Sequence, residues 1–318
     1  MRVLITGISG FIGSHLAEYV NSNLNQPQLY GLIRPHSSLA NLKKVSGQVK
    51  YYTADLLEFP SLLSPLDEIR PDFIFHLAGR GAPSFSSSLP ARTVEVNLVG
   101  TINLLEAIIE LHLNPRIVIA SSGEAYGLAF ADELPMKESS LFRPLNPFGV
   151  SKAAQDMLGF QYFKSHNLKI IRARLFSLVG PRQPEYFFVS GLAKQIAEIE
   201  KKKKDPIIYA GNLENKRDYT DVRDLVRALW LIAEKGEEGE AYNLGSGQAW
   251  FGKEILKTLL GMTRAKIVVE TEEKRLRPAD PPILLADINR LVKLTGWKPQ
   301  INLKQSLLDV LNYWREEI

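Results

Sequence analysis

The chain has 318 residues, of which 45% are hydrophobic and 23% are charged, and its net charge at pH 7 is only +4. This balance is typical of a folded globular enzyme, and it excludes a disordered, fibrous or coiled-coil protein. So small an excess of positive charge does not indicate a nucleic-acid partner. The chain contains no cysteine, which excludes disulfides, thiolate metal ligands and a cysteine nucleophile, and we predict no metal site.

The N-terminus begins directly with a strand pattern, Met1-Arg2-Val3-Leu4-Ile5. No apolar stretch of the chain reaches the length of a signal-peptide core or of a membrane-spanning helix of ~20 residues. We therefore expect a cytoplasmic protein that has no membrane partner.

Short apolar runs alternate with longer helical patterns through the first 175 residues. Runs that are continuously apolar are expected of parallel strands buried on both faces, and repeated strand–helix units of this kind build a parallel sheet. The predicted strands cover 3–5, 29–33, 49–52, 73–77, 117–119 and 170–173, and the predicted helices cover 11–22, 101–111 and 151–165. We therefore predict an α/β fold with a doubly wound parallel sheet.

The pattern loosens after residue 176, where a helix near 191–203 is followed by irregular segments. We expect two domains. The first covers 1–175, and the chain returns to it near 218–245 and 283–292. The second is a smaller α/β lobe formed mainly by 176–318.

Three glycines, Gly7, Gly10 and Gly13, occupy the turn between the first predicted strand and the first predicted helix. Glycine lets the backbone turn sharply and approach a pyrophosphate, whose charge then meets the unpaired N–H groups at the start of the helix. Three glycines alone are a weak signal, but here they follow a strand and open a helix, which is the context that the pattern requires. The first domain is therefore predicted to be a Rossmann domain that binds a dinucleotide.

The end of the second predicted strand indicates which dinucleotide binds. Arg34 stands there, where an NAD-binding enzyme usually carries an acidic residue for the ribose 2′-hydroxyl. An arginine favours a 2′-phosphate, so we predict NADP rather than NAD. Asp55, after the third strand, is expected to accept a hydrogen bond from the adenine amino group, and Leu77 and Ala78, after the fourth strand, are expected to line the path to the nicotinamide.

Several segments together resemble one protein family. They are the glycine spacing, Asp55, 76–78, Asn97, 121–127 and 147–152. Over nearly the whole chain this pattern is similar to the extended short-chain dehydrogenase/reductase family, and most similar to its members that act on GDP-4-keto-6-deoxy sugars. The resemblance implies a GDP-sugar substrate held by the second lobe, and a homodimer formed through helices 101–111 and 151–165.

The catalytic pair of this family is a tyrosine four residues before a lysine. That spacing places both on one helix face, where the ammonium lowers the pKa of the phenol from ~10 and holds the nicotinamide ribose. This chain keeps Lys152 but has Phe148 in place of the tyrosine, and a phenyl ring has no proton to give. Because general acid catalysis is typically worth ~10² to 10⁴ in rate, we expect good binding and slow turnover. Either Phe148 replaces a tyrosine, which the intact surrounding pattern favours, or another group donates the proton.

Ser122 and Glu124 follow the fifth predicted strand. By the resemblance, Ser122 polarises the reacting C4 carbonyl, and Glu124 occupies the position at which sugar-nucleotide dehydratases carry the base for the C5 proton. Related reductases also have glutamate there, so a reductase and a dehydratase both stay open.

The resemblance also implies the remaining cofactor-binding and substrate-binding residues. The cofactor-binding residues are Gly7, Ser9, Gly10, Phe11, Ile12, Gly13, Arg34, Asp55, Leu56, Leu77, Ala78, Lys152 and Leu175. The substrate-binding residues are Ser84, Ser122, Ser177, Val189, Lys194, Arg217, Arg277 and Asp280. Ser177 replaces an asparagine common in relatives, for which Arg182 or Gln183 could compensate, and Asp218 is expected to be structural.

The expected activity is NADPH-dependent reduction of the C4 ketone of a GDP-4-keto-6-deoxy sugar, slowed by Phe148. The first alternative is a nucleotide-sugar 4,6-dehydratase. A 4-epimerase is disfavoured because such enzymes usually hold NAD. A non-catalytic sugar-nucleotide binder is the alternative that Phe148 supports.

Overall fold

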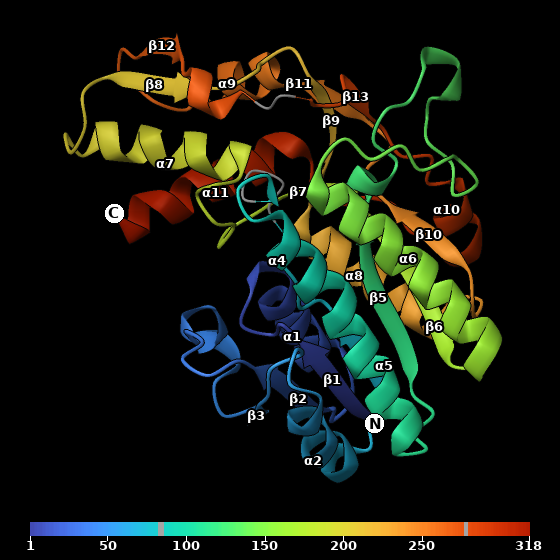
Figure 1. Ribbon diagram of the computed structural model, residues 1–318. Helices are drawn as coiled ribbons and strands as arrows, with labels where there is room; N and C mark the ends of the chain where they lie inside the picture. The colour runs from blue at the N-terminus through green and yellow to red at the C-terminus, as the bar shows by residue number, and fades with distance from the viewer. Residues whose placement is uncertain (82–85, 277–278) are drawn as a thin grey trace.

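The computed structural model describes residues 1–81, 86–276 and 279–318. A sheet of seven parallel strands forms its larger part (Figure 1). The strands follow the order β10-β6-β5-β4-β1-β2-β3, in which the chain winds first to one edge and then to the other. They are β1 (Arg2–Thr6), β2 (Gln28–Ile33), β3 (Val49–Thr53), β4 (Phe73–His76), β5 (Arg116–Ser122), β6 (Lys169–Leu175) and β10 (Ala241–Leu244). The predicted doubly wound parallel sheet is confirmed.

Each face of this sheet carries its own hydrophobic core. Side chains alternate along a strand, so Val3 and Ile5 point to one face and Leu4 to the other, and all three are completely buried. The first face is covered by α1 (Phe11–Asn23), α8 (Val222–Lys235) and α10 (Asn289–Thr295). The second is covered by α2 (Phe59–Ile69), α5 (Gly100–Glu110) and α6 (Pro147–His166).

A second group of elements lies beyond the carboxyl ends of β5 and β6, at the top of Figure 1. One small sheet contains β7 (Ser177–Val179), β9 (Lys216–Asp221), β11 (Ala249–Phe251) and β13 (Ile283–Leu284), and a strand pair joins β8 (Ile207–Ala210) to β12 (Val268–Thr271). The helices are α7 (Phe188–Glu200), α9 (Gly252–Leu260) and α11 (Leu303–Glu317), which share one core. The chain leaves this group to contribute α8, β10 and α10 to the large sheet.

Short helical segments connect these elements. They are η1 (Ala40–Val45), α4 (Pro90–Val94), η2 (Glu95–Val99), η3 (Gly123–Ala125), η4 (Ala131–Glu133) and η5 (Glu273–Arg275). None of the helices in the described residues is long and apolar enough to cross a membrane.

Among the predicted helices, those of 151–165 and 191–203 differ most from the structure. The helix predicted for 151–165 begins at Pro147, because Asn146 caps it by accepting a hydrogen bond from Gly149 N (2.8 Å) and proline suits the first helical position. Phe148 and Lys152 therefore both lie in its first turns. The helix predicted for 191–203 ends at Glu200, so the lysine run that follows lies just outside it.

Candidate active site

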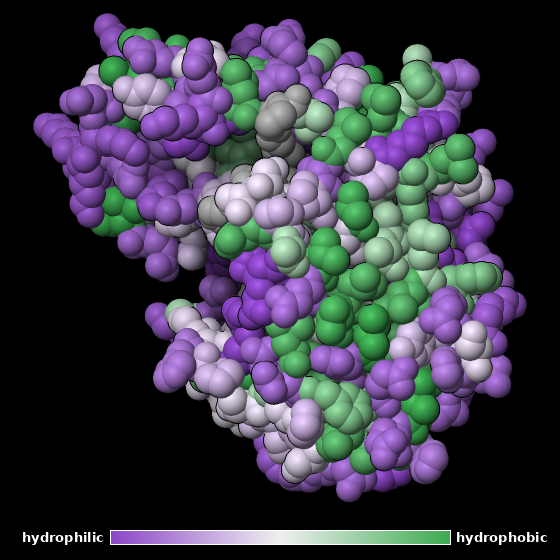
Figure 2. Space-filling view, in the orientation of Figure 1, coloured by the Kyte–Doolittle hydropathy of each residue, from purple (hydrophilic) through white to green (hydrophobic). Residues whose placement is uncertain are grey.

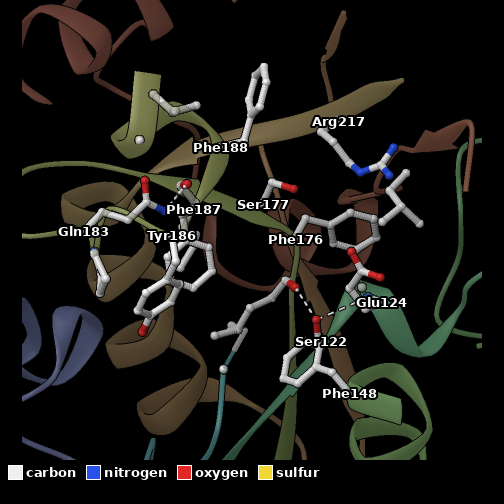
Figure 3. A pocket seen from close by; sticks show the side chains of 18 of the residues that line it. Ser122, Glu124, Phe148, Phe176, Ser177, Gln183, Tyr186, Phe187, Phe188 and Arg217 are labelled. Carbon is white, nitrogen blue, oxygen red and sulfur yellow. Dashed lines mark hydrogen bonds between the residues drawn. The ribbon is translucent and has the colours of Figure 1, made fainter. Parts of the chain in front are cut away.

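A cavity of about 1120 Å³ lies between the carboxyl ends of the large sheet and the second group of elements. The molecule is notched between the two groups of elements in the space-filling view (Figure 2). Within the cavity, Ser122, Glu124 and Phe148 lie together at one end, and Arg217 and Phe188 lie toward the other (Figure 3). The predicted site residues that line it are Gly7, Gly10, Phe11, Ile12, Gly13, Leu77, Ser122, Glu124, Phe148, Lys152, Leu175, Ser177, Val189, Arg217 and Asp280.

The turn between β1 and α1 has the shape of a phosphate-binding turn. Gly7 has φ +69°, and a Cβ atom there would lie 2.8 Å from Ala78 Cα. A Cβ at Gly13 would lie 2.3 Å from Gly7 O. No side chain caps the start of α1, so its first N–H groups remain available to an anion. These residues fit the pyrophosphate of a dinucleotide.

The other predicted cofactor residues do not line the cavity. Ser9 accepts a hydrogen bond from Asn41 through its carbonyl oxygen (3.0 Å), and Ala78 donates its N–H to Thr6 Oγ1 (3.1 Å). Arg34 is exposed directly after β2. The Asp55 carboxylate accepts from Leu57 N (3.0 Å), and the Leu56 carbonyl accepts from Asn103 (2.8 Å).

Ser122 and Glu124 lie where β5 ends in a single helical turn. The Ser122 hydroxyl accepts from Glu124 N (3.2 Å) and donates to Leu175 O across a long distance of 3.5 Å (Figure 3). Asn146 donates to Glu124 Oε2 (2.9 Å). The start of α6 therefore fixes the carboxylate at the cavity wall, while the long bond of Ser122 is easily exchanged for a substrate oxygen.

Phe148 and Lys152 are both buried at the same end of the cavity. The Lys152 amine lies 5.9 Å from the centre of the Phe148 ring, and it donates to Ala120 O and Gln155 Oε1 at 2.7 Å each. Burial lowers the pKa of Lys152 from 10.5 to about 7. We therefore expect the Lys152 amine to lose its proton, and with it its charge, as the pH rises through neutrality.

The far end of the cavity carries a guanidinium in a fixed orientation. Arg217 donates to Asp280 at 2.7 Å, and Asn215 holds the second oxygen of that carboxylate at 2.7 Å. Arg217 is 8% exposed, so its charge faces the cavity more than the bulk solvent. This arrangement suits a phosphate group, which arginine binds through paired N–H donors.

One predicted substrate residue, Lys194, is not brought to this wall, and two others are not described. Lys194 forms ion pairs with Glu185 and Glu198 and does not line the cavity. Helix α7 presents Val189 to the cavity instead, because Val189 and Lys194 lie on different faces of the helix. Ser84 and Arg277 lie outside the described residues.

Sequence reasoning did not single out an aromatic wall of the cavity. It consists of Phe176, Tyr186, Phe187 and Phe188, and the rings of Tyr186 and Phe187 lie tilted against each other with centres 4.9 Å apart (Figure 3). The signal was the run of three aromatic residues, Tyr186 to Phe188, at the start of α7. Its position relative to the catalytic residues depends on the loop, which local sequence does not determine.

Gln183 and Arg182 lie in the same loop but have different surroundings. Gln183 lines the cavity. Arg182 points away from it and pairs with Glu18 (2.6 Å), so it is not available to compensate for Ser177. Asp218 is structural, as predicted, because it accepts from Ser246 N (2.7 Å) and from backbone N–H groups nearby.

The sheet, the glycine turn and the pairing of Ser122 with Lys152 at one cavity define the class of extended short-chain dehydrogenases/reductases. The model of the GDP-mannose 4,6 dehydratase family matches residues 4–310, and the chain belongs to this family. No group of three or more His, Asp or Glu side chains able to hold a metal occurs in the described part of the chain.

Named relatives include both reductases and dehydratases. GDP-6-deoxy-D-mannose reductase from Pseudomonas aeruginosa is 32% identical over 317 residues, covering 100% of this chain and 98% of the relative. GDP-mannose 4,6-dehydratase from Vibrio cholerae is 28% identical, covering 97% of this chain and 92% of the relative. The solved structure of RMD from Pseudomonas aeruginosa complexed with NADPH has a TM-score of 0.87 and 31% identity, covering 100% of this chain and 99% of that one.

Proposed function

We propose that this protein is an NADP(H)-dependent reductase of the C4 ketone of a GDP-4-keto-6-deoxy sugar, in which Phe148 slows the chemical step. One observation carries this proposal: a single cavity joins the glycine turn, Ser122 and Lys152 to a phosphate-compatible arginine, Arg217. The 32% identity with a GDP-6-deoxy-D-mannose reductase over the full chain supports the same substrate class.

Different residues along the cavity have different roles in the proposed reaction. The dinucleotide, when bound, supplies a hydride. The glycine turn and the start of α1 hold its pyrophosphate, and Lys152 holds the ribose of the nicotinamide. Ser122 donates its hydroxyl proton in a hydrogen bond to the C4 oxygen of the sugar, where negative charge develops. Phe148 packs at this place without a proton to give, so the step lacks its general acid.

NADP is the coenzyme that we propose, because Arg34 offers a cation directly after β2 and no acidic side chain stands at this position. The relative solved with NADPH supports this choice. Arg34 is exposed, so its contact with a 2′-phosphate is screened by water and its contribution is modest.

The second group of elements is proposed to hold the nucleotide of the substrate. Arg217, held by Asp280, binds the diphosphate, and Val189 on α7 contacts the base or its ribose. We accordingly propose a dinucleotide domain of 1–175 with the returning segments near 218–245 and 283–292, and a sugar-nucleotide lobe within 176–318.

A dehydratase is the second candidate. It is supported by the fixed position of the Glu124 carboxylate at the cavity wall, 2.9 Å from Asn146 Nδ2. In that reaction Glu124 removes the C5 proton, and the hydride returns to the sugar within one turnover. Such an enzyme therefore consumes no coenzyme.

The test restores the hydroxyl with Phe148→Tyr. We expect oxidation of NADPH by a GDP-4-keto-6-deoxy sugar, measured by absorbance, to accelerate by about 10² to 10⁴. Phe130→Tyr adds a hydroxyl to an exposed ring that does not line the cavity and should leave the rate unchanged. Conversion of GDP-mannose without net coenzyme consumption would identify the dehydratase instead. If Phe148→Tyr binds both ligands but catalyses neither reaction, the protein is a sugar-nucleotide binder.

We also propose a homodimer formed through α5 and α6. Three apolar side chains of α6 are exposed, namely Val150, Met157 (64%) and Phe160. Figure 2 shows a hydrophobic area over the surface where α5 and α6 lie in Figure 1. Patches of this kind mark protein interfaces. Met157→Glu should convert the dimer to a monomer in analytical ultracentrifugation, and a wild-type chain that sediments as a monomer contradicts the proposal.

A further inference from the structure

A buried chain of hydrogen bonds lies behind Lys152, on the side away from the cavity. The Lys152 amine donates to Gln155 Oε1 (2.7 Å), and Gln155 Nε2 donates to Thr101 Oγ1 (2.7 Å). Gln155 and Thr101 are completely buried, and Gln155 does not line the cavity. The mechanism proposed above does not use this glutamine.

The hydrogen bond from Thr101 to Asn97 O assigns the donors and acceptors along this chain. Thr101 donates its own proton to Asn97 O (2.6 Å), so it must accept from Gln155 and from His76 Nε2 (2.9 Å). His76 is then neutral with its proton on Nε2, and its Nδ1 accepts from Thr6 Oγ1 (2.9 Å). Burial and the charge of Lys152 lower the pKa of His76 to about 3, which agrees with the neutral form.

This order fixes the amide of Gln155 in one orientation. If the amide were reversed, its NH₂ group would face the Lys152 ammonium, and its oxygen would face a Thr101 hydroxyl whose proton is already donated. The carbonyl of Gln155 therefore has to point at Lys152. Because its partners extend to Thr6 at the end of β1, the orientation is anchored in the central sheet.

Both hydrogen-bond acceptors of the Lys152 amine are neutral: Ala120 O and Gln155 Oε1. Within the described residues, no carboxylate forms an ion pair with it. The titratable and charged groups on the elements packed around it are His76 on β4, Arg80 after β4, Glu124 after β5 and Asp156 on α6, of which Asp156 is paired with Arg172 and Arg174. Lys152 thus has a buried charge without a counter-ion, and burial lowers its pKa to about 7.

We propose that Gln155 is the positioning residue of Lys152: its carbonyl, anchored through Thr101 and His76, holds the amine in the orientation in which it reaches the dinucleotide. The inference rests on the proposed role of Lys152 in holding the nicotinamide ribose. A carboxylate at this position would pair with the amine and keep it charged at every physiological pH. Glutamine orients the Lys152 amine without keeping it charged.

The first test measures the ionisation of Lys152 in the protein without ligands. Proteins with ¹³C-labelled lysine side chains are titrated by NMR, and Lys152→Met identifies the signal. We expect a midpoint near pH 7 in the wild type and a rise of more than about one pH unit in Gln155→Glu. Gln161→Glu adds the same charge at an exposed position of α6 and should leave the midpoint unchanged. Equal midpoints in the wild type and Gln155→Glu would overturn the proposal.

The second test follows NADPH affinity with pH by calorimetry. As the wild-type amine loses its proton between pH 6 and 8.5, we expect the Kd to rise by about tenfold, the usual worth of a hydrogen bond to a charged group. Gln155→Glu should keep its affinity across this range. Gln155→Met, which removes the carbonyl, should bind more weakly at all pH values while keeping its circular dichroism spectrum.

The two tests separate this inference from the proposed function. If no variant binds NADPH, the proposed function fails, and the NMR titration still decides whether Gln155 controls the ionisation of Lys152. If NADPH binds and its pH dependence is the same in the wild type and Gln155→Glu, the positioning role of Gln155 is wrong.

Discussion

The two sides of the cavity are built in different ways. On the sheet side, Gly7 directly follows β1, Gly13 lies in the first turn of α1 and Ser122 ends β5. The two glycines present only backbone to the cavity. On the other side, side chains such as Tyr186 and Arg217 come from separate segments between 183 and 284. In the function that we propose, the first side recognises a feature common to dinucleotides, whereas the second, the substrate side, determines which sugar nucleotide enters.

One junction connects the two sides. Arg182, in the loop after β7, bonds Glu18 and His15 of α1 and the carbonyl oxygen of Asn41 (2.7 Å). His15 Nε2 in turn lies 3.0 Å from Pro181 O. This loop also carries Gln183 and Tyr186, so the substrate side is held against the helix that begins at the glycine turn.

The largest effect is expected from Gly13→Ala. The added Cβ would lie 2.3 Å from Gly7 O and 2.7 Å from Ile8 Cα, so the turn has to open. We expect NADPH affinity to fall by about a hundredfold, corresponding to about 3 kcal/mol of strain, while GDP affinity stays unchanged. Calorimetry measures both. Gly261→Ala, whose added Cβ would meet only ordinary van der Waals contacts, is the control. Equal losses of NADPH and GDP affinity in Gly13→Ala would show that the two sides of the cavity do not bind different ligands.

The junction should weaken at acid pH. Burial and the neighbouring Arg182 lower the pKa of His15 from 6.5 to about 4, so the unfolded chain binds a proton in this range that the folded chain does not. The free energy of unfolding must therefore fall as the pH drops from 6.5 toward 4, by about 1.4 kcal/mol per unit for this group. Urea unfolding of the wild type and His15→Gln tests this prediction. The variant should lose less stability between pH 7 and 4.5, and identical slopes would argue against it.

Arg217→Gln tests the substrate side. A charge-assisted hydrogen bond contributes about 1.5 to 3 kcal/mol, so we expect GDP to bind at least about tenfold more weakly and NADPH to bind as before. Arg264→Gln removes an exposed arginine from the same part of the molecule and should change neither affinity. An unchanged GDP affinity in Arg217→Gln would remove this residue from the site.

The smallest effect is expected from Arg34→Asp. Because Arg34 is exposed, water screens its charge, and we expect the ratio of NADPH to NADH affinities to fall by about tenfold or less. Titrating both coenzymes into both proteins gives this ratio. A variant that keeps the wild-type preference would show that another group binds the 2′-phosphate.

The comparison also explains how much the sequence could predict. The strands, the doubly wound sheet and the turn at Gly7 could be predicted, because apolar runs and glycines determine the local backbone conformation. The pairing of Phe148 with Lys152 followed from the family resemblance, and the structure places both in the first turns of α6. The link from Gln155 to Thr101 crosses from α6 to α5, and such contacts depend on tertiary packing that no local pattern encodes.

The substrate side was less accessible to prediction for the same reason. Lys194 was expected near the substrate, but the structure pairs it with Glu185, nine residues earlier in the chain. The turn that brings Glu185 back to α7 also presents Tyr186 and Phe187 to the cavity. Composition indicates that such aromatic residues are buried somewhere, and only the fold decides what they face.

Calorimetric titration of the wild-type chain, first with NADPH and then with GDP, measures whether the cavity holds both ligands at once. Two sides of one cavity that serve different ligands predict one site for each, and saturation with the first leaves the second able to bind. Competition between NADPH and GDP for a single site, or the absence of heat for both at millimolar concentration, would contradict the account.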